Sequence, residues 1–181
     1  MRALDIHEGR VIPTPEALAV PVISALYSRD KSKKKERAFD ELCYVVFMTD
    51  PRKANPYMGL NLEERRDKLI KEVLSNKKPD KLVDEAVKWW QDYWNRNIPE
   101  IEVWQDAQSA ATSLMDYLKN VDYEERTKGG SMVHNPNHVA STLAKVSDIL
   151  QQLNSLGRKI QEEAFDIIKS RGGREINPLE R

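Results

Sequence analysis

Apolar residues recur three or four positions apart along most of the chain, which is the spacing of one face of an α-helix. The first 13 residues differ, because they alternate weakly and end at Pro13. The pattern predicts an all-α fold: a helical bundle of five to six helices with an extended N-terminal arm and a long C-terminal helix. These helices are expected to begin near residues 14, 31, 61, 80, 99 and 136.

Capping residues and prolines mark several of these helix boundaries. Thr14 is followed by a proline, which is typical of an N-cap with proline at the first helical position. Pro21 is expected to kink or split the helix that follows. Asn61 with Glu64 three residues later indicates a capping box. The segment 50–59 holds two prolines and a glycine, so it is predicted to be a loop.

The chain has four tryptophans, at positions 89, 90, 94 and 104. Three of them fall on two adjacent apolar rows of one predicted helix, beside aliphatic residues. Tryptophans can stack on nucleic-acid bases, but this spacing favours a protein core or a subunit interface. We therefore predict that Trp89, Trp90, Tyr93 and Trp94 are buried against helices of the same chain or of a neighbour.

The predicted C-terminal helix carries a heptad pattern about four repeats long. Its apolar residues step alternately by four and three: Val139, Leu143, Val146, Leu150, Leu153, Gly157, Ile160, Ala164 and Ile167. A helix of this length spans roughly 50 Å, more than a compact bundle of this size needs. Antiparallel packing within the chain and packing of part of the helix on another chain both fit this pattern.

The elements divide the chain into a helical core and four flanking parts. These are an extended N-terminal arm (1–13), a helical core domain (14–121), a flexible connection (122–135), the long C-terminal helix (136–171) and a tail (172–181). The connection is polar and contains Gly129 and Gly130, which favour a break between helices.

Composition narrows the classes of function. The 29 basic and 29 acidic side chains balance, so no overall field attracts a polyanion or an anionic membrane. The one cysteine, Cys43, lies in an apolar run and is expected to pack in the core rather than to act as a nucleophile. The N-terminus lacks the continuous apolar segment of a signal peptide, and no stretch approaches the roughly 18 apolar residues of a membrane span, so secretion and membrane insertion are not expected.

We recognise no catalytic motif in the sequence. It lacks a glycine-rich phosphate loop, a GxSxG turn and paired CxxC motifs. His134 and His138 have the spacing of a helical metal site, but Pro136 between them places His134 before the helix begins. Adjacent acids such as Glu63 and Glu64 diverge on a helix and are expected to be solvated. We therefore predict no enzymatic activity, no metal site and no cofactor.

The strongest local charge feature is a basic cluster at residues 29–37. It holds six cations and two anions, and the cations are Arg29, Lys31, Lys33, Lys34, Lys35 and Arg37. The cluster falls where a helix is predicted to begin, and there each cation opposes the helix dipole by roughly a few tenths of a kcal/mol. A nearby anion would offset this cost. That anion could be nucleic-acid phosphate or an acidic surface of another subunit, and simple solvation of the cluster is the third interpretation.

The segment around this cluster resembles a known class of proteins. It runs from Ser28 to Lys35, continues from Ala38 to Met48, and ends in the loop motifs at 50–52 and 55–57. A charged RDKSK-type opening, an aromatic-rich helix and a short loop ending in Pro-Tyr resemble small structural proteins of tailed bacteriophages, particularly of crAss-like phages. The resemblance covers about residues 21–75 of the 181.

This resemblance implies a virion component of the portal and tail region, such as a head-tail connector or ring protein, assembled in the host bacterial cytoplasm. The implied partners are copies of the chain in a ring and other virion proteins such as portal and tail components, with DNA in proximity and no membrane. The resemblance does not separate a connector from a tail, capsid or cargo position. A nucleic-acid-binding or regulatory helical module is the alternative function, and an enzyme or other protein is the third hypothesis.

Overall fold

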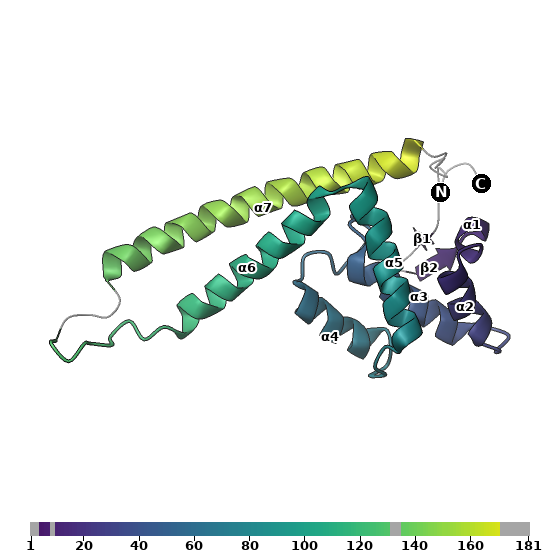
Figure 1. Cartoon of the computed structure of the whole chain (residues 1–181), viewed down its shortest axis with the longest axis horizontal. Helices are drawn as coiled ribbons and strands as arrows, with labels where there is room; N and C mark the ends of the chain where they lie inside the picture. Colours follow the sequence, from purple (N-terminus) through teal and green to yellow (C-terminus); the bar gives the residue numbers. More distant parts are fainter. Residues whose placement is uncertain (1–3, 8–9, 131–134, 171–181) are drawn as a thin grey trace. The chain divides into compact units, whose positions relative to one another are not determined.

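A computed structural model describes residues 4–7, 10–130 and 135–170, and in these ranges the chain is all-α with a short β-hairpin (Figure 1). Its elements are β1 (Leu4–His7), β2 (Arg10–Pro13), α1 (Pro15–Leu18), α2 (Pro21–Arg29), α3 (Glu36–Thr49), α4 (Leu62–Glu72), α5 (Lys81–Asn97), α6 (Glu100–Asn120) and α7 (Pro136–Ser170). The chain divides into two compact units. Unit 1 comprises Met1–Ile101 with Ile160–Arg181, and unit 2 comprises Glu102–Lys159.

The predicted all-α class and the long C-terminal helix are confirmed. The described residues form seven helices rather than five to six, because the first predicted helix is split into α1 and α2. Pro21 has no N–H to donate to the carbonyl of Ala17, and it holds Val20 in an extended conformation with ψ of 123°. The helix therefore stops and restarts at Pro21.

The described residues of the N-terminal arm, 4–7 and 10–13, are extended as predicted, and they pair as two strands. β1 pairs antiparallel with β2, with Leu4 opposite Pro13 and Ile6 opposite Val11. β2 packs on α3, where the backbone N–H of Val11 donates to Sγ of Cys43 at 3.4 Å. Cys43 is buried, as expected, and desolvation raises the pKa of its thiol.

Helix α3 is the centre of unit 1. It is buried along most of its length and contacts β2, α2, α4 and α5. Trp90 and Trp94 of α5 are only 2% and 1% exposed, while Trp89 and Tyr93 are half-buried. The predicted burial is thus confirmed fully for two of the four rings and in part for the other two.

The predicted loop after α3 is held in place by one arginine of α4. The guanidinium of Arg65 is fully buried and donates to four backbone carbonyls. Their donor–acceptor distances lie between 2.7 and 3.1 Å, and the carbonyls belong to Met48, Tyr57, Met58 and Leu60. Desolvation lowers the pKa of Arg65 to about 10, so the group stays charged at neutral pH. Arg65 therefore ties the end of α3 to the loop.

Unit 2 is built from α6 and α7, which run antiparallel (Figure 1). The indole of Trp104 donates to the carbonyl of Leu153 at 2.9 Å, and an added Cβ at Gly157 would lie 3.1 Å from the same indole nitrogen. A side chain larger than glycine at position 157 would therefore crowd the Trp104 indole unless that ring shifts. Antiparallel packing within the chain, one of the two arrangements that fit the heptad pattern, is the arrangement seen at Trp104, Leu153 and Gly157.

Several parts of the sequence prediction fall partly or wholly outside the described residues, among them residues 1–3 and 8–9 of the N-terminal arm. His134 and the tail at 172–181 also lie outside, and the structure describes the predicted connection at 122–130 and 135. Among the described residues, no helix is both long enough and apolar enough to cross a lipid bilayer.

Candidate functional site

The basic cluster lies mainly in the turn between α2 and α3, not at the start of a helix that begins near residue 31. Helix α3 begins at Glu36, five residues later than predicted. The Asp30 carboxylate accepts hydrogen bonds from the backbone N–H groups of Ser32 at 2.8 Å and Ala38 at 3.2 Å. Lys35 adopts a left-handed conformation with φ of 54°. Side-chain bonds to the backbone thus outcompete the first helical turn.

This position changes the electrostatic argument for the cluster. Arg29 is the last residue of α2, where a cation interacts favourably with the helix dipole. Lys31, Lys33 and Lys34 precede α3, and Arg37 lies in its first turn. The predicted clash with the dipole therefore does not apply to Arg29, whereas Lys35, as the N-cap, and Arg37, in the first turn, lie at the end of α3 where a cation opposes the dipole.

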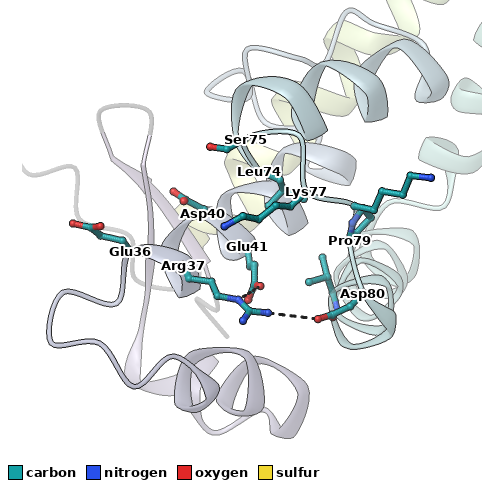
Figure 2. Close-up of a pocket in the computed structure, with 11 residues that line it drawn as sticks. Glu36, Arg37, Asp40, Glu41, Leu74, Ser75, Lys77, Pro79 and Asp80 are labelled. Atoms are coloured by element: carbon teal, nitrogen blue, oxygen red, sulfur yellow. Dashed lines mark hydrogen bonds and ion pairs between the residues drawn. The ribbon is translucent and has the colours of Figure 1, made fainter.

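Two of the six cations belong to a charge network that joins three helices. Arg29 donates to Glu41 of α3 at 3.0 Å and to Asp80 at 2.6 Å. Arg37 donates to the same Glu41 at 2.9 Å and lies 3.7 Å from Asp80 (Figure 2). Asp80 is also the N-cap of α5, because it accepts from two backbone N–H groups of the first turn at 3.1 Å each. The network thus connects the end of α2, the middle of α3 and the start of α5.

The pKa values of this network follow from its contacts. Desolvation lowers the pKa of Arg29, but its hydrogen bonds to Glu41 and Asp80 outweigh that effect, so the pKa is raised. Desolvation likewise raises the pKa of Asp80, while the hydrogen bonds from Arg29 and from backbone N–H groups lower it, and the net direction is downward. Both groups are therefore charged at neutral pH.

Lys35 is also used within the chain. Its Nζ donates to the carbonyl of Tyr27 at 3.2 Å and to the carbonyl of Asp30. The same ammonium lies 5.1 Å from the centroid of the Tyr27 ring, which is a cation–π distance. Lys35 therefore closes the turn between α2 and α3.

The remaining three cations, Lys31, Lys33 and Lys34, form an exposed group that we call the lysine loop. The contact between Lys34 and Glu36 is 3.8 Å long and joins two largely exposed side chains, so it is worth little. The structure thus separates the predicted site into two sets. Arg29, Lys35 and Arg37 stabilise the fold, whereas the lysine loop is available to a partner.

An open cavity of about 570 Å³ lies beside the network, between α3 and residues 74–83. Its lining carries both charge signs: Arg37, Lys77 and Lys78 against Glu36, Asp40, Glu41 and Asp80. Figure 2 shows Arg37 directed toward Asp80, with Asp40 and Lys77 nearby. Desolvation and the neighbouring Glu36 and Glu41 raise the pKa of Asp40. Such a lining can contact a protein surface that also carries both signs.

Sequence reasoning missed the acidic half of this site. Asp80 could be recognised as an N-cap from its position, but Arg29 is 51 residues away and no local pattern links the two. Among the described residues, no group of three or more His, Cys, Asp or Glu side chains is arranged to hold a metal ion.

The residues that carry the phage-protein resemblance hold unit 1 together. Asp50 accepts two hydrogen bonds from the Arg52 guanidinium, at 2.6 and 2.7 Å, and a third from the indole of Trp90 at 3.3 Å. Arg52 also donates to the carbonyl of Leu4, and the Asn55 amide donates to two carbonyls at the end of α3. These residues therefore stabilise the fold of this segment, and the resemblance that they carry reflects that fold rather than a binding site.

In comparisons with known proteins, no protein-family model, no curated protein and no solved structure matches the chain.

Proposed function

We propose that the chain is a structural virion protein of a tailed bacteriophage, most specifically a head-tail connector or portal-proximal ring subunit. It acts through protein–protein contacts with copies of itself and with other virion proteins such as portal and tail components. Its place of action is the particle, which is assembled in the bacterial cytoplasm. The resemblance of residues 21–75 supports this class of protein.

The observation that carries the proposal is the distribution of exposed apolar side chains. Eight large apolar side chains are exposed among the described residues, and six of them lie on α6 and α7. They are Val103, Tyr117, Leu143, Ile149, Leu150 and Phe165. Apolar side chains gathered on exposed elements mark surfaces that bind other proteins. The lysine loop and the mixed-charge cavity of unit 1 supply polar contacts of the kind found at interface rims.

The direct test is to find the chain in particles. Particles from an infected bacterial host are purified, and the protein is identified by mass spectrometry and located by cryo-electron microscopy of the portal and tail region. We expect a fixed copy number per particle and density around the portal axis. Absence of the protein from purified particles, with the free protein present in the infected cell, would contradict the proposal.

A nucleic-acid-binding module is the second candidate, and the exposure of the lysine loop favours it. Binding to duplex DNA is measured by fluorescence anisotropy at two salt concentrations. If the loop binds phosphate, Lys31→Gln, Lys33→Gln and Lys34→Gln together weaken binding and flatten its salt dependence. The matched control changes three exposed lysines of α4 and α5, Lys68, Lys71 and Lys88, to glutamine. Equal binding by both triple variants would show that the loop is not a DNA contact.

A further inference from the structure

We propose that the lysine loop and the start of β2 together bind an acidic segment of another protein, and that this segment carries an apolar side chain. In this contact the carboxylates of the partner meet the exposed cations, and its apolar side chain packs against Ile12. The inference rests on the proposed function, because it names the chemistry of a protein partner of the virion subunit. All of the residues that form the surface belong to unit 1.

A second open cavity of unit 1, of about 920 Å³, is lined by β2, the lysine loop and the first half of α3. Strand β2 contributes Arg10 and Ile12, the lysine loop contributes Lys34, and α3 contributes Cys43 among others. The hydrogen bond from the backbone N–H of Val11 to Sγ of Cys43 joins β2 to α3. The fold of unit 1 therefore brings the lysine loop and β2 to one cavity, although more than 20 residues separate Arg10 from Lys34 in the sequence.

The apolar part of this cavity includes an exposed side chain. Ile12 exposes 51% of its surface, whereas the adjacent Val11 is fully buried. The half-buried ring of Phe39 and the buried thiol of Cys43 line the same cavity. An apolar side chain of a partner that fills the cavity would remove these groups and Ile12 from water, which is favourable.

Cations lie beside this apolar part. Arg10 and Lys34 line the cavity, and both are exposed. Lys31 and Lys33 are exposed as well, and they precede Lys34 by so few residues that at most about 11 Å of chain separates them from it. The contact of Lys34 with Glu36 leaves the two side chains 83% and 76% exposed. The four cations are therefore accessible to the carboxylates of another protein.

The backbone of the lysine loop is held in place by bonds within the chain. Asp30 accepts hydrogen bonds from the backbone N–H groups of Ser32 and Ala38. The backbone N–H of Lys35 donates to Oγ of Ser32 at 3.0 Å, and its ammonium donates to the carbonyls of Tyr27 and Asp30. Because the loop is already ordered, a partner that binds it loses little affinity to the ordering of this backbone.

Two carboxylates favour a protein segment over a nucleic acid at this surface. Glu36 and Asp40 line the same cavity as Arg10 and Lys34. They are four residues apart on α3, so they lie on the same side of the helix. A nucleic-acid strand carries a negative charge at every step and would bring phosphates close to these carboxylates. A protein segment can place its acids at the cations alone and offer an apolar side chain to Ile12, so it avoids that repulsion.

The chemistry of the partner is tested with three fluorescent probes and the full chain. The probes are a short peptide of glutamates and leucines, the same peptide with serine in place of each leucine, and a short DNA duplex. Fluorescence anisotropy measures the dissociation constant of each probe at the same salt concentration. We expect the leucine peptide to bind about tenfold more tightly than the serine peptide, because only leucine gains from burial against Ile12. The leucine peptide should also bind more tightly than the duplex.

The apolar part of the surface is tested by Ile12→Thr, which keeps a β-branched residue in the strand. This variant should lose most of its preference for the leucine peptide and bind the serine peptide as the unaltered chain does. Val103→Thr is the matched control, because it changes an apolar side chain that is 65% exposed on α6, and it should keep the preference.

The charged part is tested by changing Lys31, Lys33 and Lys34 together to glutamine. This variant should bind both peptides about tenfold more weakly and with a flatter salt dependence. Glutamine at three other exposed lysines, Lys68, Lys71 and Lys88, is the control and should leave both affinities unchanged. Circular dichroism should show the same helix content in all four variants, because every changed side chain is exposed.

Four results would overturn the inference: no binding of either peptide, equal binding of the two peptides, tighter binding of the duplex, or unchanged binding by the lysine variant. The proposed function is judged separately by the presence of the chain in particles. A chain that is found in particles but does not prefer the leucine peptide would keep the proposed function and lose this surface. A chain that binds the leucine peptide through Ile12 but is absent from particles would show the reverse.

Discussion

Unit 1 is joined by buried polar side chains, whereas unit 2 is joined mainly by apolar ones. In unit 1, Arg65, Asp50 and Glu41 each bond to groups from several segments of the chain. In unit 2, α6 and α7 meet through one apolar side each and the hydrogen bond of Trp104 to Leu153. A buried polar network favours a single geometry, because a buried polar group that loses its hydrogen-bond partner lowers the stability of the fold. Unit 1 is thus suited to hold a fixed shape. The two helices of unit 2 cannot cover all of their apolar side chains, so some of these stay exposed and can contact a partner.

The largest expected effect is the loss of Arg65 from unit 1. In Arg65→Met the side chain keeps its volume, but four buried carbonyls lose their donor, so we expect a loss of about 3–5 kcal/mol in the free energy of unfolding. Urea unfolding followed by circular dichroism measures the loss, and hydrogen exchange should show it in α3 and α4. Lys68→Met, on the exposed side of the same helix, is the control and should change stability little. A loss below about 1 kcal/mol for Arg65→Met would mean that water replaces the guanidinium.

The next effect concerns the apolar contact of unit 2. In Gly157→Leu the new side chain meets the indole of Trp104, which is held by its hydrogen bond to Leu153. Leucine is the better helix former, so destabilisation can only come from crowding, and we expect about 1–3 kcal/mol. Faster hydrogen exchange of the backbone amides of α6 would report this destabilisation. Ser155→Leu, exposed on the same helix, gains the same propensity without the contact and should be neutral or slightly stabilising. Equal stability of the two variants would show that α6 and α7 separate easily.

A smaller effect is expected from the charge network of unit 1, and it depends on pH. The folded-state pKa of Asp80 is lowered, so its stabilising contribution is present above the unfolded value of about 3.9 and is lost as pH falls through the folded pKa. Asp80→Asn keeps an N-capping side chain but removes the charge that faces Arg29. Its stability should therefore be lower than that of the unaltered chain at neutral pH and equal to it in strong acid. Unfolding curves at several pH values test this, and a constant difference at all pH values would attribute the effect to capping.

The smallest effect has the opposite sign. Desolvation, Glu36 and Glu41 raise the folded-state pKa of Asp40, so its ionised form costs stability at neutral pH and protonation removes that cost. Asp40→Asn should therefore be slightly more stable than the unaltered chain at neutral pH, with the gain disappearing below about pH 4, the unfolded value. Asp67→Asn, which removes an exposed carboxylate of α4, is the matched control. A destabilised Asp40→Asn at neutral pH would show that the carboxylate has a favourable partner.

Local sequence determined most helix starts of this chain. Asn61 accepts from the backbone N–H of Glu64, and Asp80 accepts from those of Leu82 and Val83, as capping residues at these positions predict. The period of apolar residues likewise predicted α6 and α7 to within a residue or two of their ends. These features depend on atoms a few positions apart, so the sequence alone contains them.

Only the tertiary structure decided how distant segments meet. Asp30 bonds to Ala38 and so delays α3, the N-terminal arm pairs with itself and packs on α3, and Arg29 finds Asp80 far along the chain. The heptad pattern of α7 predicted one continuous apolar stripe, but Val146 is buried and Leu150 is exposed. A periodic sequence states which residues share a side of a helix. How much of that side is covered depends on the number of helices that pack there, and the described residues of unit 2 form two helices, so each has one helical neighbour within the unit.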